Sequence, residues 1–239
     1  MIDVCYFLGR ASRYDNWEIR YSIRSVEKNF KNLGKIWIIG QCPDFINKNL
    51  VNYISFPDEP TQNKDRNLIQ KLVYLGGESQ LTEEFIMNSD DHFIINPVDI
   101  SKFTPYIEST KFPFNKNSLW IRRMERTKST LLKFGYTQWN YDTHIPHKIN
   151  KSHCRELLKF NFDGVGMCVF TLYFNTLLND PSPNVITKEV RMELRADWRR
   201  GLKEIVSGDF AIVNDRSAGK KDVINRIESL FPTPSKYEI

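Results

Sequence analysis

Two adjacent aspartates and a histidine, Asp90, Asp91 and His92, lie between two short apolar runs. The runs, residues 85–87 and 93–95, predict extended chain on both sides, so the acids should mark the end of a strand. Open α/β sheets bind ligands beyond the carboxyl ends of their strands. Neighbouring carboxylates repel each other unless a proton or cation lies between them, and their oxygens suit Mg²⁺ or Mn²⁺ on a diphosphate. The alternative is an ordinary solvated turn.

The bulk composition indicates a globular protein with one substantial core. The chain has 239 residues, 41% hydrophobic and 13% aromatic, which argues against disorder. No apolar run approaches the roughly 20 residues that cross a bilayer, so we expect a soluble cytoplasmic protein without a transmembrane segment. A net charge of +5 suits a phosphate-rich ligand without requiring nucleic acid. The scattered cysteines predict reduced, buried thiols rather than a metal site; they are Cys5, Cys42, Cys154 and Cys168.

The first 96 residues alternate between strand and helix patterns. Apolar runs at 3–8, 35–40 and 51–56 predict strands, and residues 15–34 and 61–75 carry the spacing of amphipathic helices. A strand–helix–strand order implies a mostly parallel sheet with right-handed crossovers. The sequence has neither of the common glycine-rich phosphate loops, which argues against a P-loop enzyme and a dinucleotide oxidoreductase.

Phosphates would therefore require a metal and basic side chains. Lys64, Asn67 and Lys71 fall on one face of the predicted helix at i, i+3 and i+7. Arginines near the first strand and helix are further candidates, namely Arg10, Arg20 and Arg24. Asp90 would contribute to the same site. The alternative for each basic residue is an ordinary solvated charge.

The second half is less regular. Residues 119–123 predict a strand, 126–134 a short helix and 154–160 another, and the apolar run ending at residue 174 predicts a turn followed by a buried strand. Residues 188–200 are strongly basic and predict a helix with one arginine face, formed by Arg191, Arg195, Arg199 and Arg200. This face could hold a polyanionic acceptor or a phosphate, or be plainly exposed.

Residues 135–151 combine aromatic and titratable side chains in a way that suits a sugar. Aromatic rings pack on the apolar sides of a pyranose, while Asn, Asp and His bind its hydroxyls. Asp142 and His144 are candidate acid/base groups, because histidine titrates near neutrality and a carboxylate can orient it. Asp215 ends another apolar run and could close the metal site opposite Asp91.

Four stretches, in this order along the chain, resemble the Stealth family of sugar-phosphate transferases, which includes capsular-polysaccharide phosphotransferases. They are residues 15–28 with 35–39, residues 85–91, the His144-Ile145-Pro146 segment, and residues 213–215 with 230–238. The resemblance implies a GT-A-like nucleotide-diphospho-sugar transferase scaffold, formed as a single domain over residues 1–239. Residues 1–96 would bind the nucleotide sugar, and residues 97–239 would bind the acceptor and close the site.

The chain departs from that family after the first strand. The resemblance would require a Trp-Val-Asp-Gly-Ser-Asp-like signature there, whereas this chain continues with Gly9 and residues 10–12, without those acids. We therefore expect metal-dependent glycosyl transfer from a nucleotide-diphosphate sugar, with sugar-1-phosphate transfer as the alternative. Asp91 would hold the ion with help from Asp90, His92 or Asp215. The acceptor would be a surface glycan or a hydroxymethylated DNA base; a third possibility is an inactive glycan- or nucleotide-binding module.

Overall fold

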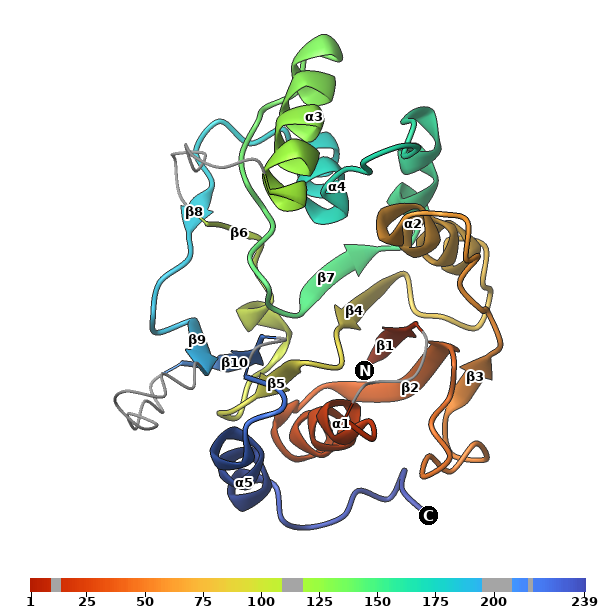
Figure 1. Ribbon diagram of the computed structural model, residues 1–239, viewed down its shortest axis with the longest axis vertical. Coiled ribbons are helices and arrows are strands. Elements are labelled where there is room, and N and C mark those ends of the chain that lie inside the picture. Colours follow the sequence, from red (N-terminus) through yellow and green to blue (C-terminus); the bar gives the residue numbers. More distant parts are fainter. Residues whose placement is uncertain (10–13, 109–117, 195–207, 215–216) are drawn as a thin grey trace.

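The computed structural model describes residues 1–9, 14–108, 118–194, 208–214 and 217–239. Its central sheet has the order β3-β2-β1-β4-β7 (Figure 1). The strands are β1 (Ile2–Leu8), β2 (Leu33–Gly40), β3 (Asn52–Ile54), β4 (Glu84–Asn88) and β7 (His147–Asn150). All neighbours are parallel except β4 and β7. The predicted fold class, α/β with a mostly parallel central sheet, is confirmed.

Helices cover both faces of this sheet (Figure 1). Side chains alternate along β1, so Val4 and Tyr6 pack with α1 (Trp17–Asn29), while Cys5 belongs to the opposite core. That second core contains α2 (Lys64–Leu75), the 3₁₀ helix η2 (Ser152–Lys159) and α4 (Val169–Leu178). The parallel strands are therefore buried on both faces, as α/β proteins require.

A second sheet continues from the end of β4. It consists of β5 (His92–Ile94), β10 (Phe210–Val213) and β9 (Arg191–Leu194), with β10 in the middle. A third apolar cluster joins this sheet to α1 and α5 (Lys221–Leu230) and includes Trp17, Phe93 and Val223. The remaining short elements are η1 (Ile100–Lys102), β6 (Tyr106–Ile107) and β8 (Asn184–Val185).

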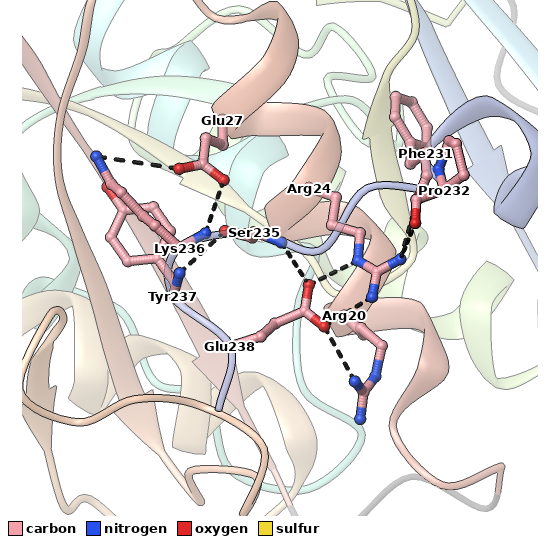
Figure 2. A network of polar contacts seen from close by, with 9 residues as sticks. All are labelled: Arg20, Arg24, Glu27, Phe231, Pro232, Ser235, Lys236, Tyr237 and Glu238. Atoms are coloured by element: carbon pink, nitrogen blue, oxygen red, sulfur yellow. Dashed lines mark hydrogen bonds and ion pairs between the residues drawn. The ribbon is translucent and has the colours of Figure 1, made fainter.

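The last nine residues, 231–239, lie against α1 and are called the closing segment below. Glu238 accepts a forked pair of hydrogen bonds from Arg24, from Nε at 2.6 Å and from Nη2 at 2.7 Å, and a third from Arg20 at 3.0 Å (Figure 2). Arg24 also donates to the carbonyl of Phe231. The segment returns to the loop after β2, where the backbone of Asn47 donates to the carbonyl of Tyr237.

The prediction of a strand at residues 119–123 is wrong. One helix, α3 (Leu119–Lys133), covers this region and the predicted short helix after it. The hydroxyl of Ser118 caps it by accepting the backbone N–H of Ile121 at 3.2 Å. The short apolar run that suggested a strand is the first turn of an amphipathic helix, which buries Met124 and Leu131.

Two further sequence predictions also fail. The apolar run up to residue 174 ends in helix α4 and not in the predicted strand. The prediction failed because this helix is buried nearly all round, so its sequence lacks an amphipathic period. Within residues 188–200, Arg191–Leu194 forms strand β9, paired with β10, where a helix was expected. Arg195, Arg199 and Arg200 lie outside the described residues.

All four cysteines are buried, as predicted, and their thiols are free in the structure. None of the helices in the described ranges combines the length and the apolar character that a bilayer-spanning segment needs.

Candidate functional site

The acidic pair lies where the sequence places it, directly after β4. Residues 89–92 form a turn, called the acidic turn below, that is closed by a bond from the backbone of His92 to the carbonyl of Ser89. The turn leads into β5, and the backbone N–H of Val213 in β10 donates to the carbonyl of Asp91 at 3.1 Å. The carboxyl end of a central parallel strand and the second sheet thus meet at Asp90 and Asp91.

Electrostatics at the acidic turn are unfavourable for two full negative charges. Burial and the neighbouring charge of Asp91 raise the pKa of Asp90 to about 6, against the partial relief given by Lys64 and backbone N–H groups. Burial also lowers the pKa of His92 to about 3, aided by the nearby His144 and Arg191, so its imidazole is neutral at physiological pH. The turn is therefore a site where an added positive charge would be stabilised.

The residues of the turn fit a divalent cation that is shared with phosphate oxygens. Mg²⁺ is usually held by one or two carboxylates together with substrate phosphates. The Nε2 of His92 lies 3.6 Å from Oδ1 of Asp91, and its buried Nδ1 has no hydrogen-bond partner in the described part of the chain. No group of three or more His, Cys, Asp or Glu side chains suited to a metal occurs among the described residues. Asp215 lies outside them, two positions after Val213.

Of the three residues predicted on one face of α2, the structure brings Lys64 toward the acidic turn. Lys64 is exposed at the first position of the helix, and its charge acts on the pKa of both Asp90 and His92. Asn67 is buried and exchanges hydrogen bonds with the backbone of Glu59. Asn67 therefore closes the loop before the helix.

Lys71 is buried at the carboxyl end of β1. Its Nζ donates to the carbonyl of Leu8 at 2.9 Å and forms an ion pair with Asp58 at 2.6 Å. A phosphate at this position would have to share the lysine with Asp58.

The arginines predicted to bind phosphate are placed differently. Arg24 and Arg20 bind Glu238, so the structure uses them to fix the closing segment to α1 (Figure 2). This pairing argues against a role in phosphate binding, because the guanidinium of Arg24 is already bound on two nitrogens by the carboxylate of Glu238. Arg10 lies outside the described residues.

Asp142 and His144 lie in the segment between α3 and β7, within electrostatic reach of the acidic turn. Charges on both act on the pKa of His92 and of His147. The carboxylate of Asp142 accepts a hydrogen bond from the indole of Trp120 at 2.7 Å, not from His144. His144 is exposed and has φ of 49°, a left-handed conformation that is costly for a residue with a side chain. Such local strain often occurs at functional positions.

Arg191 fixes this segment to the second sheet. Its guanidinium is paired with the carboxylate of Glu108 and donates to the carbonyl of Thr143 at 2.5 Å. Arg191, which was assigned to the arginine face of a predicted helix, therefore binds the backbone of the residue before His144.

The sequence reasoning missed several residues around the site. Trp120 was assigned to a strand. His147, which the sequence analysis did not single out, is buried against Phe170 with ring centroids 4.2 Å apart. Burial, followed by the effect of His92, lowers its pKa to about 3. A buried polar group beneath the acidic turn, Tyr6, Ser22 and Asn88, was also missed. The sequence held one indication of this group. Ser22 and Ser25 are the polar residues that lie nearest the apolar face of the predicted helix at residues 15–34.

Comparisons with known proteins identify the fold. The sequence matches no family model and no curated protein. In structure, the chain is similar to the galactosyltransferase LgtC in complex with donor and acceptor sugar analogs, with a TM-score of 0.52, 9% identity and 98% of each chain covered. An active-site mutant of LgtC matches with a TM-score of 0.50, 10% identity and the same coverage. Mouse xyloside xylosyltransferase 1 in its apo form matches with a TM-score of 0.46, 9% identity, and 91% of this chain and 99% of that chain covered. The match to LgtC shows that the chain has the fold of GT-A glycosyltransferases.

Proposed function

We propose that the protein transfers a sugar from a nucleotide-diphosphate sugar to an acceptor hydroxyl, with the donor's phosphates at the acidic turn. The observation that carries this proposal is the position of Asp90 and Asp91 at the carboxyl end of β4 in a GT-A-like fold. Ligands of open α/β sheets bind at this edge. The raised pKa of Asp90 supports it, because a bound cation would relieve the repulsion that raises the pKa.

The roles of the chain's own residues follow from their surroundings. A divalent ion, when bound, would offset the negative charge of the departing nucleoside diphosphate. Asp91 and ionised Asp90 would supply carboxylate oxygens to it, with neutral His92 or Asp215 as further ligands. Lys64 adds positive charge beside them. Asp142 or His144 would take the proton of the acceptor hydroxyl as the glycosidic bond forms.

The test is a set of thermal-shift and turnover measurements with Mn²⁺ and a panel of nucleotides and nucleotide sugars. A ligand present at 100 times its Kd stabilises the folded state by about 2.7 kcal/mol, so a matching donor should raise the Tm. Asp91→Ala should keep the fold, abolish this metal-dependent shift and reduce turnover by ~100-fold or more. Glu84→Ala is the matched control, because Glu84 lies at the opposite end of the same strand and is paired with Lys148.

Full activity of Asp91→Ala, or of the wild-type protein in excess chelator, would contradict the metal role. Slow metal-dependent release of the nucleotide in the absence of acceptor would separate a working site from an inactive binding module.

Sugar-1-phosphate transfer, which the resemblance to the Stealth family suggested, would use the same acidic turn. No family model supports that resemblance, so it is the second candidate. Mass spectrometry of the product separates the two reactions, because phosphotransfer leaves one phosphate between sugar and acceptor. The acceptor can be tested by salt-dependent retention on DNA, which a hydroxymethylated DNA base would require and a surface glycan would not.

A further inference from the structure

The acidic turn rests on a buried group of polar side chains that none of the proposed chemistry uses. Ser22 of α1 is fully buried, and its hydroxyl lies 2.5 Å from the carbonyl of His92 and 3.3 Å from that of Ser89. These two carbonyls are the two ends of the acidic turn. A single side chain from a different element therefore contacts both ends of the segment that carries Asp90 and Asp91.

The direction of the hydrogen bonds can be worked out by counting donors. A serine hydroxyl has one proton, and the shorter contact, to the carbonyl of His92, is where it is donated. The hydroxyl of Tyr6, 3.1 Å from Ser22 Oγ, must then donate to Ser22. The amide of Asn88 donates to both, at 3.1 Å to Tyr6 and 3.2 Å to Ser22. The result is one ordered chain from Asn88 through Tyr6 and Ser22 to the carbonyl of His92.

The surroundings keep this chain in one state. Tyr6 and Ser22 are fully buried and Asn88 is nearly so. Burial raises the pKa of Tyr6 well above its usual range, so the phenol remains a donor at every pH at which the protein would work. The buried Oδ1 of Asn88 has no hydrogen-bond partner in the described part of the chain, but both hydroxyls and the Asn88 amide nitrogen are bonded. Losing one of these bonds in a low-dielectric interior would leave a further buried polar group unsatisfied, which restrains the network.

We propose that Ser22, supported by Tyr6 and Asn88, is a positioning residue that sets the geometry of Asp90 and Asp91 for a metal-bound diphosphate. This inference rests on the proposed function, since it concerns how the same site is held. Groups that orient the ligands of a metal typically change metal affinity or activity by ~10–100-fold when they are removed.

Ser25 provides a matched control one turn further along the same helix. It is also fully buried, and its hydroxyl donates to the carbonyl of Ser22 and accepts the backbone N–H of Ile94. The hydrogen bond from Ile94 ties Ser25 to β5 at a position after the acidic turn. Ser22→Ala and Ser25→Ala therefore each remove one buried hydroxyl from α1, with four polar contacts at Ser22 and two at Ser25, but only Ser22→Ala releases the turn.

The experiment measures two quantities for the wild type and both variants: the Tm without ligand, and the Mn²⁺ affinity in the presence of uridine diphosphate, by titration calorimetry. We expect both variants to lose Tm, but a Mn²⁺ affinity reduced by ~10-fold or more in Ser22→Ala alone. Ser22→Thr keeps the hydroxyl and should retain most of the affinity, even if the extra methyl group lowers its Tm. The Mn²⁺ affinity of Tyr6→Phe should lie between that of Ser22→Ala and that of the wild type.

Each outcome is decisive. If the wild type binds Mn²⁺ with the nucleotide and both serine variants bind equally well, the positioning role is overturned and the proposed function stands. If Ser22→Ala is too unstable to measure, a loss of affinity in folded Tyr6→Phe supports the role, and unchanged affinity in that variant rejects it. If the wild type shows no metal-dependent binding, the proposed function fails and this inference fails with it.

Discussion

The closing segment and the acidic turn both place carboxylates in poorly solvated surroundings, yet the pKa of the carboxylate is shifted in opposite directions at the two places. At Glu238, burial alone would raise the pKa, but hydrogen bonds from Arg24 and the charges of Arg24 and Arg20 lower it instead. At Asp90, burial and the charge of Asp91 act in the same direction and raise the pKa. The first arrangement holds two parts of the chain together, whereas the second leaves a repulsion between two carboxylates that an added positive charge would relieve.

The largest effect on stability should come from breaking the first arrangement. Glu238→Gln leaves Arg24, whose side chain is 10% exposed, without a carboxylate. We expect a loss of ~3 kcal/mol in the free energy of unfolding at pH 7, measured by urea denaturation. Because the folded-state pKa of Glu238 is lowered, its contribution is present above the unfolded-state pKa and is lost as the pH falls, so the two proteins should converge in acid. An undiminished difference at low pH would contradict this account.

A smaller effect of the opposite sign is expected at the acidic turn. Asp90→Asn removes one of two repelling charges and should stabilise the protein by about 1–2 kcal/mol at pH 8. The folded-state pKa is raised, so the destabilisation it relieves is present above about pH 6 and absent below the unfolded-state value. The gain should therefore vanish near pH 4, while metal-dependent turnover falls. Loss of stability in this variant at pH 8 would mean that Asp90 is a structural residue.

The smallest effect should come from an exposed pair in the closing segment. Lys236 lies 4.0 Å from Glu27, and its side chain is 63% exposed. Lys236→Ala should change the free energy of unfolding by less than ~0.5 kcal/mol, because solvent screens such pairs. A change as large as that of Glu238→Gln would show that the whole segment, rather than the buried arginine–glutamate contact, carries the stability.

The sequence predicted the parts of the molecule whose apolar residues recur with a clear helical or strand period, or whose ends are marked by polar residues. Strand β4 and the acidic turn, helix α1 and the parallel half of the sheet follow from apolar spacing and from the acids between residues 85 and 95. The beginning of α3 was assigned to a strand because its first turn is a short apolar run, whereas residues 126–134 were predicted as a helix. Helix α4 was missed because a helix buried nearly all round gives no amphipathic period.

The partners of charged residues were also beyond reach of sequence reasoning. Nothing near Arg24 in the sequence indicates Glu238, and nothing near Lys71 singles out Asp58, because these contacts depend on how distant segments pack. Asp90 and Asp91, which one local segment carries, therefore lie at the predicted strand end, whereas Arg24 and Lys71 have distant ion-pair partners that the sequence did not indicate.

The long reach of α1 across the chain has a consequence for biosynthesis. The indole of Trp17 donates to the carbonyl of Ala218, 201 residues later, and Arg24 donates to the carboxylate of Glu238, 214 residues later. At ~5–20 residues per second on the ribosome, the helix emerges on the order of 10–40 s before its partners exist. A nascent chain can form the parallel core early, but the surroundings of the acidic turn are completed only after β10 has been synthesised and has paired with β5.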